Sequence, residues 1–128
     1  MAGESILIVD DNPTNLKLAR VILEGESYSV VTAENAEQAL EVLDQMQPDL
    51  ILMDLQLPGM DGLTLTSRLR RDERWKNTTI VALTAYAMKG DAEKAALAGC
   101  DGYITKPIEP PDLTSAVAAY LARKRVAH

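Results

Sequence analysis

DLILMDLQLPGMDG, residues 49–62, places a carboxylate directly after an apolar run. Residues 50–53 are all apolar, and an unbroken run of this kind is typical of a β-strand buried on both faces. Asp54 follows the run at once. A charged carboxylate at the mouth of a buried strand is costly unless another group compensates its charge. The stretch therefore predicts a buried strand with a functional carboxylate at its end.

The rest of the chain alternates between short apolar runs and longer amphipathic segments. Strands are predicted at residues 5–9, 28–33, 50–53, 79–83 and 102–105, and helices at 12–25, 35–46, 62–71, 91–99 and 110–125. Asn12 followed by Pro13 is typical of a helix start, and Gly99 is a natural residue for a helix end. The alternation predicts an α/β fold with a mainly parallel five-stranded sheet and helices on both of its faces.

Length and composition limit the classes of function. A chain of 128 residues is expected to form a single domain, 1–128, and its net charge of −6 argues against nucleic acid or an anionic membrane as the main partner. The one cysteine, Cys100, excludes an internal disulfide and fits the cytoplasm. No apolar run approaches the ~18–20 residues of a membrane span, and the N-terminus lacks the features of a signal peptide.

Polar side chains follow four of the five predicted strands. Asp10 and Asp11 follow the first, Asp54 the third, Thr84 the fourth and Lys106 the fifth. Parallel strands bring their carboxyl ends to one edge, so these groups can converge there. Clustered carboxylates favour a hard divalent cation, Mg²⁺ above all, with Mn²⁺ as the alternative. A cation beside an ammonium and a hydroxyl suits a phosphoryl group, and a carboxylate there can act as the nucleophile.

Each of these residues also has an ordinary structural interpretation. Asp10 and Asp11 could cap the first helix, and Asp54 could begin the turn that follows it. Thr84 is of a type common at strand ends, and Lys106 could be a solvated loop lysine. These explanations are independent of one another, whereas a phosphoryl site explains all the positions together.

Four segments resemble the receiver domain of bacterial response regulators, the CheY-like superfamily. They are ILIVDDN (6–12), LILMDLQLPGMDG (50–62), VALTAYA (81–87) and GYITKPI (102–108). The resemblance covers essentially the whole chain. It is nearest to single-domain regulators of the DivK type and to the receiver domains of hybrid histidine kinases. It implies a flavodoxin-like sheet with the strand order 2-1-3-4-5.

The resemblance implies a phosphorylation site at the mouth of the third strand. Asp54 would accept a phosphoryl group from a phosphohistidine on a histidine kinase or a histidine phosphotransfer protein. Asp11, Asp54 and the backbone carbonyl of Gln56 would hold Mg²⁺, and Asp10 would help directly or through water. The chain would thus assist its own phosphorylation and dephosphorylation without being an enzyme that turns over an external substrate.

The resemblance also implies a switch. Lys106 would pair with the phosphoryl oxygens, and a cis peptide bond would join it to Pro107. Thr84 would move towards the phosphoryl group, and Tyr103 would turn inward. The face formed by the fourth helix, the fifth strand and the fifth helix would then dock a downstream protein, in a monomer or weak homodimer without an output domain of its own.

The fourth predicted helix offers little apolar surface for docking. Its potential core residues are mostly alanines, and Leu97 is the one large residue among them. We therefore expect this helix and the preceding loop, 86–90, to form the movable element of the switch.

Three other functions share parts of this pattern. A haloacid-dehalogenase-type phosphatase needs a second Asp two residues after the nucleophile, and Gln56 stands there. A receiver-like module that signals without phosphate usually lacks an acidic ligand or the lysine, and this chain keeps them. A nucleotide- or flavin-binding protein would need a Gly-rich phosphate loop after the first strand, which DDNPTN (10–15) does not provide.

Overall fold

The computed structural model describes residues 3–126 apart from 56, 58, 85–88 and 106–108. Its elements are β1 (Ser5–Val9), α1 (Pro13–Glu24), β2 (Ser29–Ala33), α2 (Ala36–Leu43), β3 (Leu50–Asp54), α3 (Gly62–Arg70), β4 (Thr79–Thr84), α4 (Lys89–Ala98), β5 (Gly102–Thr105) and α5 (Pro110–Val126). All ten predicted elements are confirmed. The largest differences are that α2 ends at Leu43 and that α4 begins at Lys89. No helix in the described ranges is long and apolar enough to cross a membrane.

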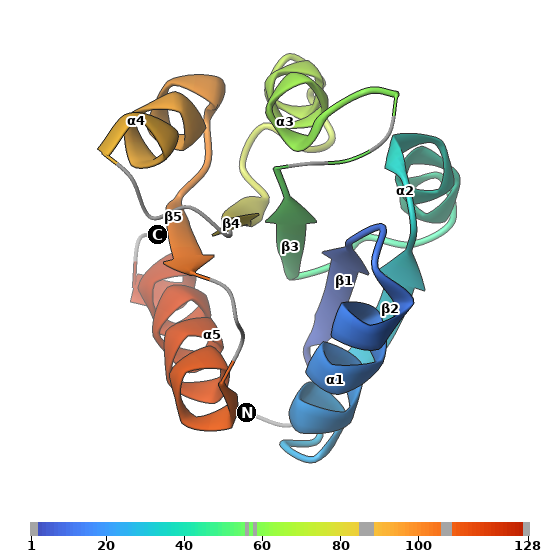
Figure 1. Cartoon of the computed structure of the whole chain (residues 1–128), viewed down its shortest axis with the longest axis vertical. Helices are drawn as coiled ribbons and strands as arrows, with labels where there is room; N and C mark the ends of the chain where they lie inside the picture. Colours follow the sequence, from blue (N-terminus) through green and yellow to red (C-terminus); the bar gives the residue numbers. More distant parts are fainter. Residues whose placement is uncertain (1–2, 56, 58, 85–88, 106–108, 127–128) are drawn as a thin grey trace.

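The five strands form one parallel sheet in the order β2-β1-β3-β4-β5, as the resemblance implies (Figure 1). The register pairs Val9 with Met53 at the carboxyl ends of β1 and β3. It pairs Asp54 with Leu83 in β4. Because all strands point the same way, the residues that end β1, β3 and β4 lie at one edge of the sheet.

Two hydrophobic cores lie on opposite faces of the sheet. Successive strand residues point to opposite faces, so Ile6 and Ile8 join the core beneath α1 and α5, whereas Leu7 and Val9 join the core beneath α2 and α3. Trp75, in the connection after α3, is 4% exposed and anchors that connection in the second core. The central strands β1, β3 and β4 are therefore buried on both faces and fix the site edge rigidly.

Helix capping follows the sequence signals. The Asn12 side chain accepts hydrogen bonds from the backbone of the first turn of α1, with Pro13 at the first helical position. Asn35 Oδ1 accepts from the Gln38 backbone at 2.8 Å, so Asn35 caps α2. Gly99, which follows α4, has a φ of +111°, a conformation that favours glycine.

The described side chains of α4, residues 93–98, provide little apolar packing. Ala95 is 2% exposed and is the one fully buried side chain among those described in this helix. Leu97 is 88% exposed, so the expectation that it packs into the core is wrong. Two residues advance a helix by about 200°, which turns Leu97 away from the face that Ala95 buries.

Leu97→Ser should leave the free energy of unfolding within ~0.5 kcal/mol of the unchanged chain, since an exposed side chain loses no burial. Leu113→Ala, in α5, should cost about 2–5 kcal/mol because Leu113 is 0% exposed. Urea unfolding of both variants checks this contrast. A large loss for Leu97→Ser would show that the side chain packs against the fold.

Arg70 ties the C-terminal end of α3 to two connections. Its guanidinium donates hydrogen bonds to four backbone carbonyls, those of Trp75, Lys76, Thr78 and Gly99. It also pairs with the Asp101 carboxylate at 2.9 Å, and the same carboxylate oxygen accepts from the Ile80 backbone N–H at 2.8 Å. Arg70 thus joins the start of β4 to the turn that precedes β5.

Candidate functional site

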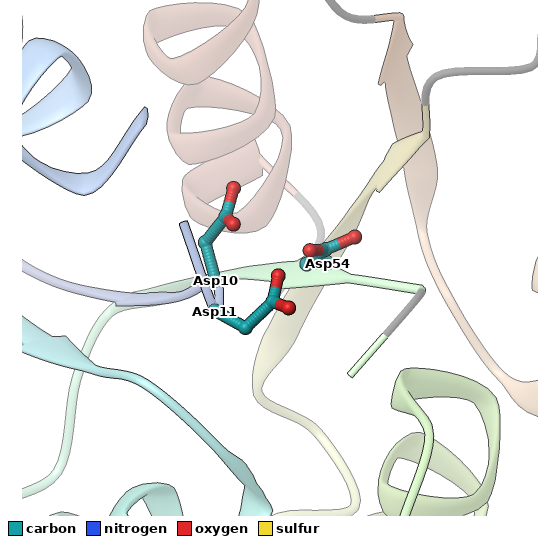
Figure 2. Close-up of side chains that lie close together, drawn as sticks. All are labelled: Asp10, Asp11 and Asp54. Carbon is teal, nitrogen blue, oxygen red and sulfur yellow. The ribbon is translucent and has the colours of Figure 1, made fainter. Parts of the chain in front are cut away.

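Three carboxylates meet where β1 and β3 end (Figure 2). Asp10 and Asp11 directly follow β1, and Asp54 is the last residue of β3. One oxygen from each lies within 4.8 Å of the others. Asp10 is 1% exposed and Asp54 4%, whereas Asp11 is exposed. The convergence predicted from the sequence is therefore present for these three residues.

The backbone around β1 explains why Asp10 and Asp11 lie there. The Asp10 N–H donates to the Ala33 carbonyl at 3.1 Å, which continues the β1–β2 ladder by one residue. Asp10 Oδ1 accepts from the Asn12 N–H at 2.9 Å. Asn12 itself caps α1. Helix capping therefore does not account for Asp11, and the Asp11 side chain remains available to the cluster.

Gly62, at the start of α3, packs against the backbone of Asp54 and helps to set its position. Its N–H donates to the Leu55 carbonyl at 3.3 Å, and a Cβ on Gly62 would collide with the carbonyl oxygen of Asp54. The Leu55 N–H donates to the Leu83 carbonyl at 3.2 Å. The first turn of α3 thus rests on the backbone of the residue that carries the carboxylate, and that backbone is fixed to β4.

The structure places Thr84 at the same edge. Thr84 is the last residue of β4, beside Leu83, the register partner of Asp54, and it is 5% exposed. Tyr103 in β5 is 46% exposed, so its ring faces outward in this state. The predicted residues Gln56, Lys106 and Pro107, the cis bond included, lie outside the described residues.

The donor set fits a hard divalent cation. Three carboxylates with oxygens within 4.8 Å of one another repel, and carboxylate oxygens are the ligands that Mg²⁺ prefers. Asp10, Asp11 and Asp54 are the residues that could hold such an ion. Mg²⁺ takes one or two carboxylates and keeps several waters, which leaves room for a phosphoryl oxygen beside Asp54.

Cys100, in the turn before β5, is a packed residue and not a reactive thiol. Its Sγ lies 3.9 Å from the Thr66 hydroxyl, and burial raises the pKa of the Cys100 thiol. A raised pKa leaves less thiolate at neutral pH, and the thiolate is the nucleophile. Cys100 therefore contributes to packing.

Comparison with known proteins defines the family. Residues 6–118 match the response regulator receiver domain. The polar-differentiation response regulator DivK of Brucella anthropi is 41% identical over 118 residues, 92% of this chain and 96% of DivK. The chain therefore belongs to the receiver domain family of response regulators.

Solved structures agree in fold. A putative response regulator from Chloroflexus aurantiacus is 36% identical, with a TM-score of 0.90 over 94% of this chain and 99% of that one. The receiver domain of a Pseudomonas aeruginosa sensor histidine kinase is 34% identical, with a TM-score of 0.86 over 94% of this chain and 99% of that one. That structure has a magnesium ion coordinated in its active-site cleft. The chain is thus a receiver domain of two-component signalling and not an enzyme of external substrate turnover.

Proposed function

We propose that the chain is a phosphoacceptor: Asp54 receives a phosphoryl group from a phosphohistidine on a histidine kinase or a histidine phosphotransfer protein. The observation that carries the proposal is the cluster of Asp10, Asp11 and Asp54 at the mouths of β1 and β3. The nucleophile stands on a rigid strand, and the other two carboxylates lie beside it as metal ligands. Membership of the receiver family supports the same assignment.

In the reaction, an Asp54 carboxylate oxygen attacks phosphorus in line with the donor imidazole. A P–O bond forms, the P–N bond breaks, and the imidazole leaves with the electron pair and takes up a proton. Mg²⁺, when bound, neutralises charge on the phosphoryl oxygens. Asp11, Asp54 and the backbone carbonyl of Gln56 would hold the ion, and Asp10 would help directly or through water.

The remaining roles follow from the resemblance. Lys106 pairs with a phosphoryl oxygen, and the Thr84 hydroxyl donates to another. The 5% exposure of Thr84 supports its part, because a buried hydroxyl at this edge has little solvent to compete for it. Tyr103 then turns from its half-exposed position into the space that Thr84 leaves. These movements change the face formed by α4, β5 and α5, where a downstream protein docks.

Acetyl phosphate with Mg²⁺ should add one phosphoryl mass to the intact chain. Asp54→Asn and a chelator should each abolish the gain, because the first removes the nucleophile and the second the cation. Asp61→Asn is the matched control: Asp61 Oδ1 caps α3 by accepting from the Thr64 N–H, and Asn caps as well. Modification of Asp54→Asn to the same extent would overturn the proposal.

Amide hydrogen exchange tests the movable element. Residues 91–98 should exchange faster than residues 113–121, since Ala95 provides most of the described burial of α4, whereas Leu113, Val117 and Leu121 are buried in α5. Phosphorylation should change exchange in 91–98 more than in 113–121. Slower exchange in α4 than in α5 would contradict a weakly docked switch helix.

Residues 1–128 act in this proposal as one receiver domain. The partners are a phosphohistidine donor and a downstream protein, with no nucleic acid and no membrane, and the protein is a cytoplasmic monomer or weak homodimer. The net charge of −6 supports the part of this proposal that excludes nucleic acid.

A further inference from the structure

Thr66 is a fully buried polar residue one turn into α3. Its side chain is 0% exposed, and its hydroxyl donates to the Gly62 carbonyl at 2.8 Å. The same oxygen accepts from the Cys100 thiol at 3.9 Å. Both hydrogen-bonding capacities of the hydroxyl are thus engaged, and its proton is directed to Gly62.

Gly62 is the residue that packs on Asp54. A Cβ there would collide with the Asp54 carbonyl oxygen, and the Gly62 N–H donates to Leu55. The Thr66 hydroxyl is therefore separated from the backbone of Asp54 by a single residue. A hydrogen bond from a threonine to the carbonyl four residues earlier bends a helix slightly, so it sets how the first turn of α3 lies on Asp54.

Thr114 provides an internal comparison. In α5 its hydroxyl makes the same kind of bond, to the Pro110 carbonyl at 3.0 Å, but this bond is exposed to solvent and Thr114 is only half-buried. Water can replace that bond when it is lost. The Thr66 bond is buried between α3 and the turn before β5, where a lost partner is not replaced.

We propose that Thr66 is a positioning residue for the phosphorylation of Asp54: through Gly62 its hydroxyl holds the first turn of α3 against the Asp54 backbone. The inference rests on the proposed function for its link to phosphoryl transfer. It also concerns metal binding, because the Asp54 carboxylate contributes to both. Small displacements of a reacting group cost large factors in rate.

Thr66→Val removes the hydroxyl at nearly constant shape, and Thr66→Ser restores it. Two quantities are measured: the rate of phosphorylation by acetyl phosphate, from intact mass, and Mg²⁺ affinity by calorimetry. Thr66→Val should slow phosphorylation about tenfold and weaken Mg²⁺ binding severalfold. Thr66→Ser and the matched control Thr114→Val should stay within about twofold of the unchanged chain in both. If Thr66→Val does not fold, Thr66→Ala takes its place with the same expected result.

The two measurements separate the inference from the proposed function. If the unchanged chain takes up no phosphoryl group but Thr66→Val weakens Mg²⁺ binding and Thr66→Ser does not, the proposed function fails and the positioning role stands. If Thr66→Val unfolds at lower urea concentration yet keeps both the phosphorylation rate and the Mg²⁺ affinity, Thr66 is merely structural and the inference is overturned. An equal effect of Thr114→Val would overturn it as well.

Discussion

Gly62→Ala should lose most of its phosphorylation by acetyl phosphate, with a rate lower by on the order of 100-fold. The expected cause is a steric clash of the added Cβ and not an unfavourable φ angle at position 62. Gly62 does not have the positive φ of Gly59 and Gly99, but a Cβ at this position would meet the Asp54 carbonyl oxygen. Either α3 or the end of β3 has to move, and Asp54 moves relative to Asp10 and Asp11 in both cases.

The same substitution should lower the free energy of unfolding by about 1–3 kcal/mol, the usual cost of overpacking a well-packed contact. Intact mass over time gives the rate, and urea unfolding gives the stability. Gly25→Ala, at the end of α1, is the matched control because its Cβ would meet only carbonyls of its own helix, at 3.3 and 3.4 Å. A Gly62→Ala chain that is phosphorylated at the normal rate would show that this contact does not position Asp54.

Arg70→Ala should lower the free energy of unfolding by about 2–4 kcal/mol. The side chain is 18% exposed and serves four carbonyls and the Asp101 carboxylate. Its removal leaves several of these acceptors short of a donor in a partly buried place. Because Asp101 also accepts from Ile80 of β4, the start of β5 loses part of its attachment to the sheet.

Urea unfolding at constant m-value measures this loss. The stability of Arg70→Lys should lie between that of the unchanged chain and that of Arg70→Ala. An ammonium can pair with Asp101 but lacks the forked donors that reach several carbonyls. Arg68→Ala is the matched control, an exposed arginine on the same helix. An Arg70→Ala chain within ~0.5 kcal/mol of the unchanged one would mean that the bonds of Arg70 are replaced by water.

Much of the fold could be predicted from the sequence because its signals are local. The apolar run 50–53 predicts a strand buried on both faces, and Asn12, Asn35 and Gly99 mark helix ends by the conformations and hydrogen bonds that these residue types favour. The strand order has no local signal of this kind, because it depends on which strands pair across the sheet. The resemblance to receiver domains implies the order, and the sheet confirms it.

The orientation of Leu97 could not be predicted because α4 has no clear apolar stripe. In an alanine-rich helix many rotations about its axis bury similar small side chains, so the sequence does not select the face. The structure turns Ala95 inward and leaves Leu97 at the surface. Exposed Leu97 of α4 and half-exposed Tyr103 of β5 belong to two of the elements to which we assign partner docking.

The carboxylates of the site were predictable, but the residues that support them were not. Asp10, Asp11 and Asp54 each follow an apolar run, a pattern visible in the chain. Gly62 had a weaker signal, the Asp61–Gly62 pair at the start of a helix. Thr66 also contacts Cys100 in a turn about thirty residues further along, where Arg70 contacts Gly99, and no local pattern indicates such contacts.

The most direct test of the central claim locates the phosphoryl group on the chain. The protein is incubated with acetyl phosphate and Mg²⁺ and reduced with borohydride, which converts an acyl phosphate of aspartate to homoserine, and its peptides are sequenced by mass spectrometry. Phosphorylation of Asp54 predicts homoserine at position 54, with Asp10, Asp11 and Asp61 unchanged. Homoserine at another aspartate, with position 54 unmodified, would contradict the assignment of Asp54 as the phosphoacceptor.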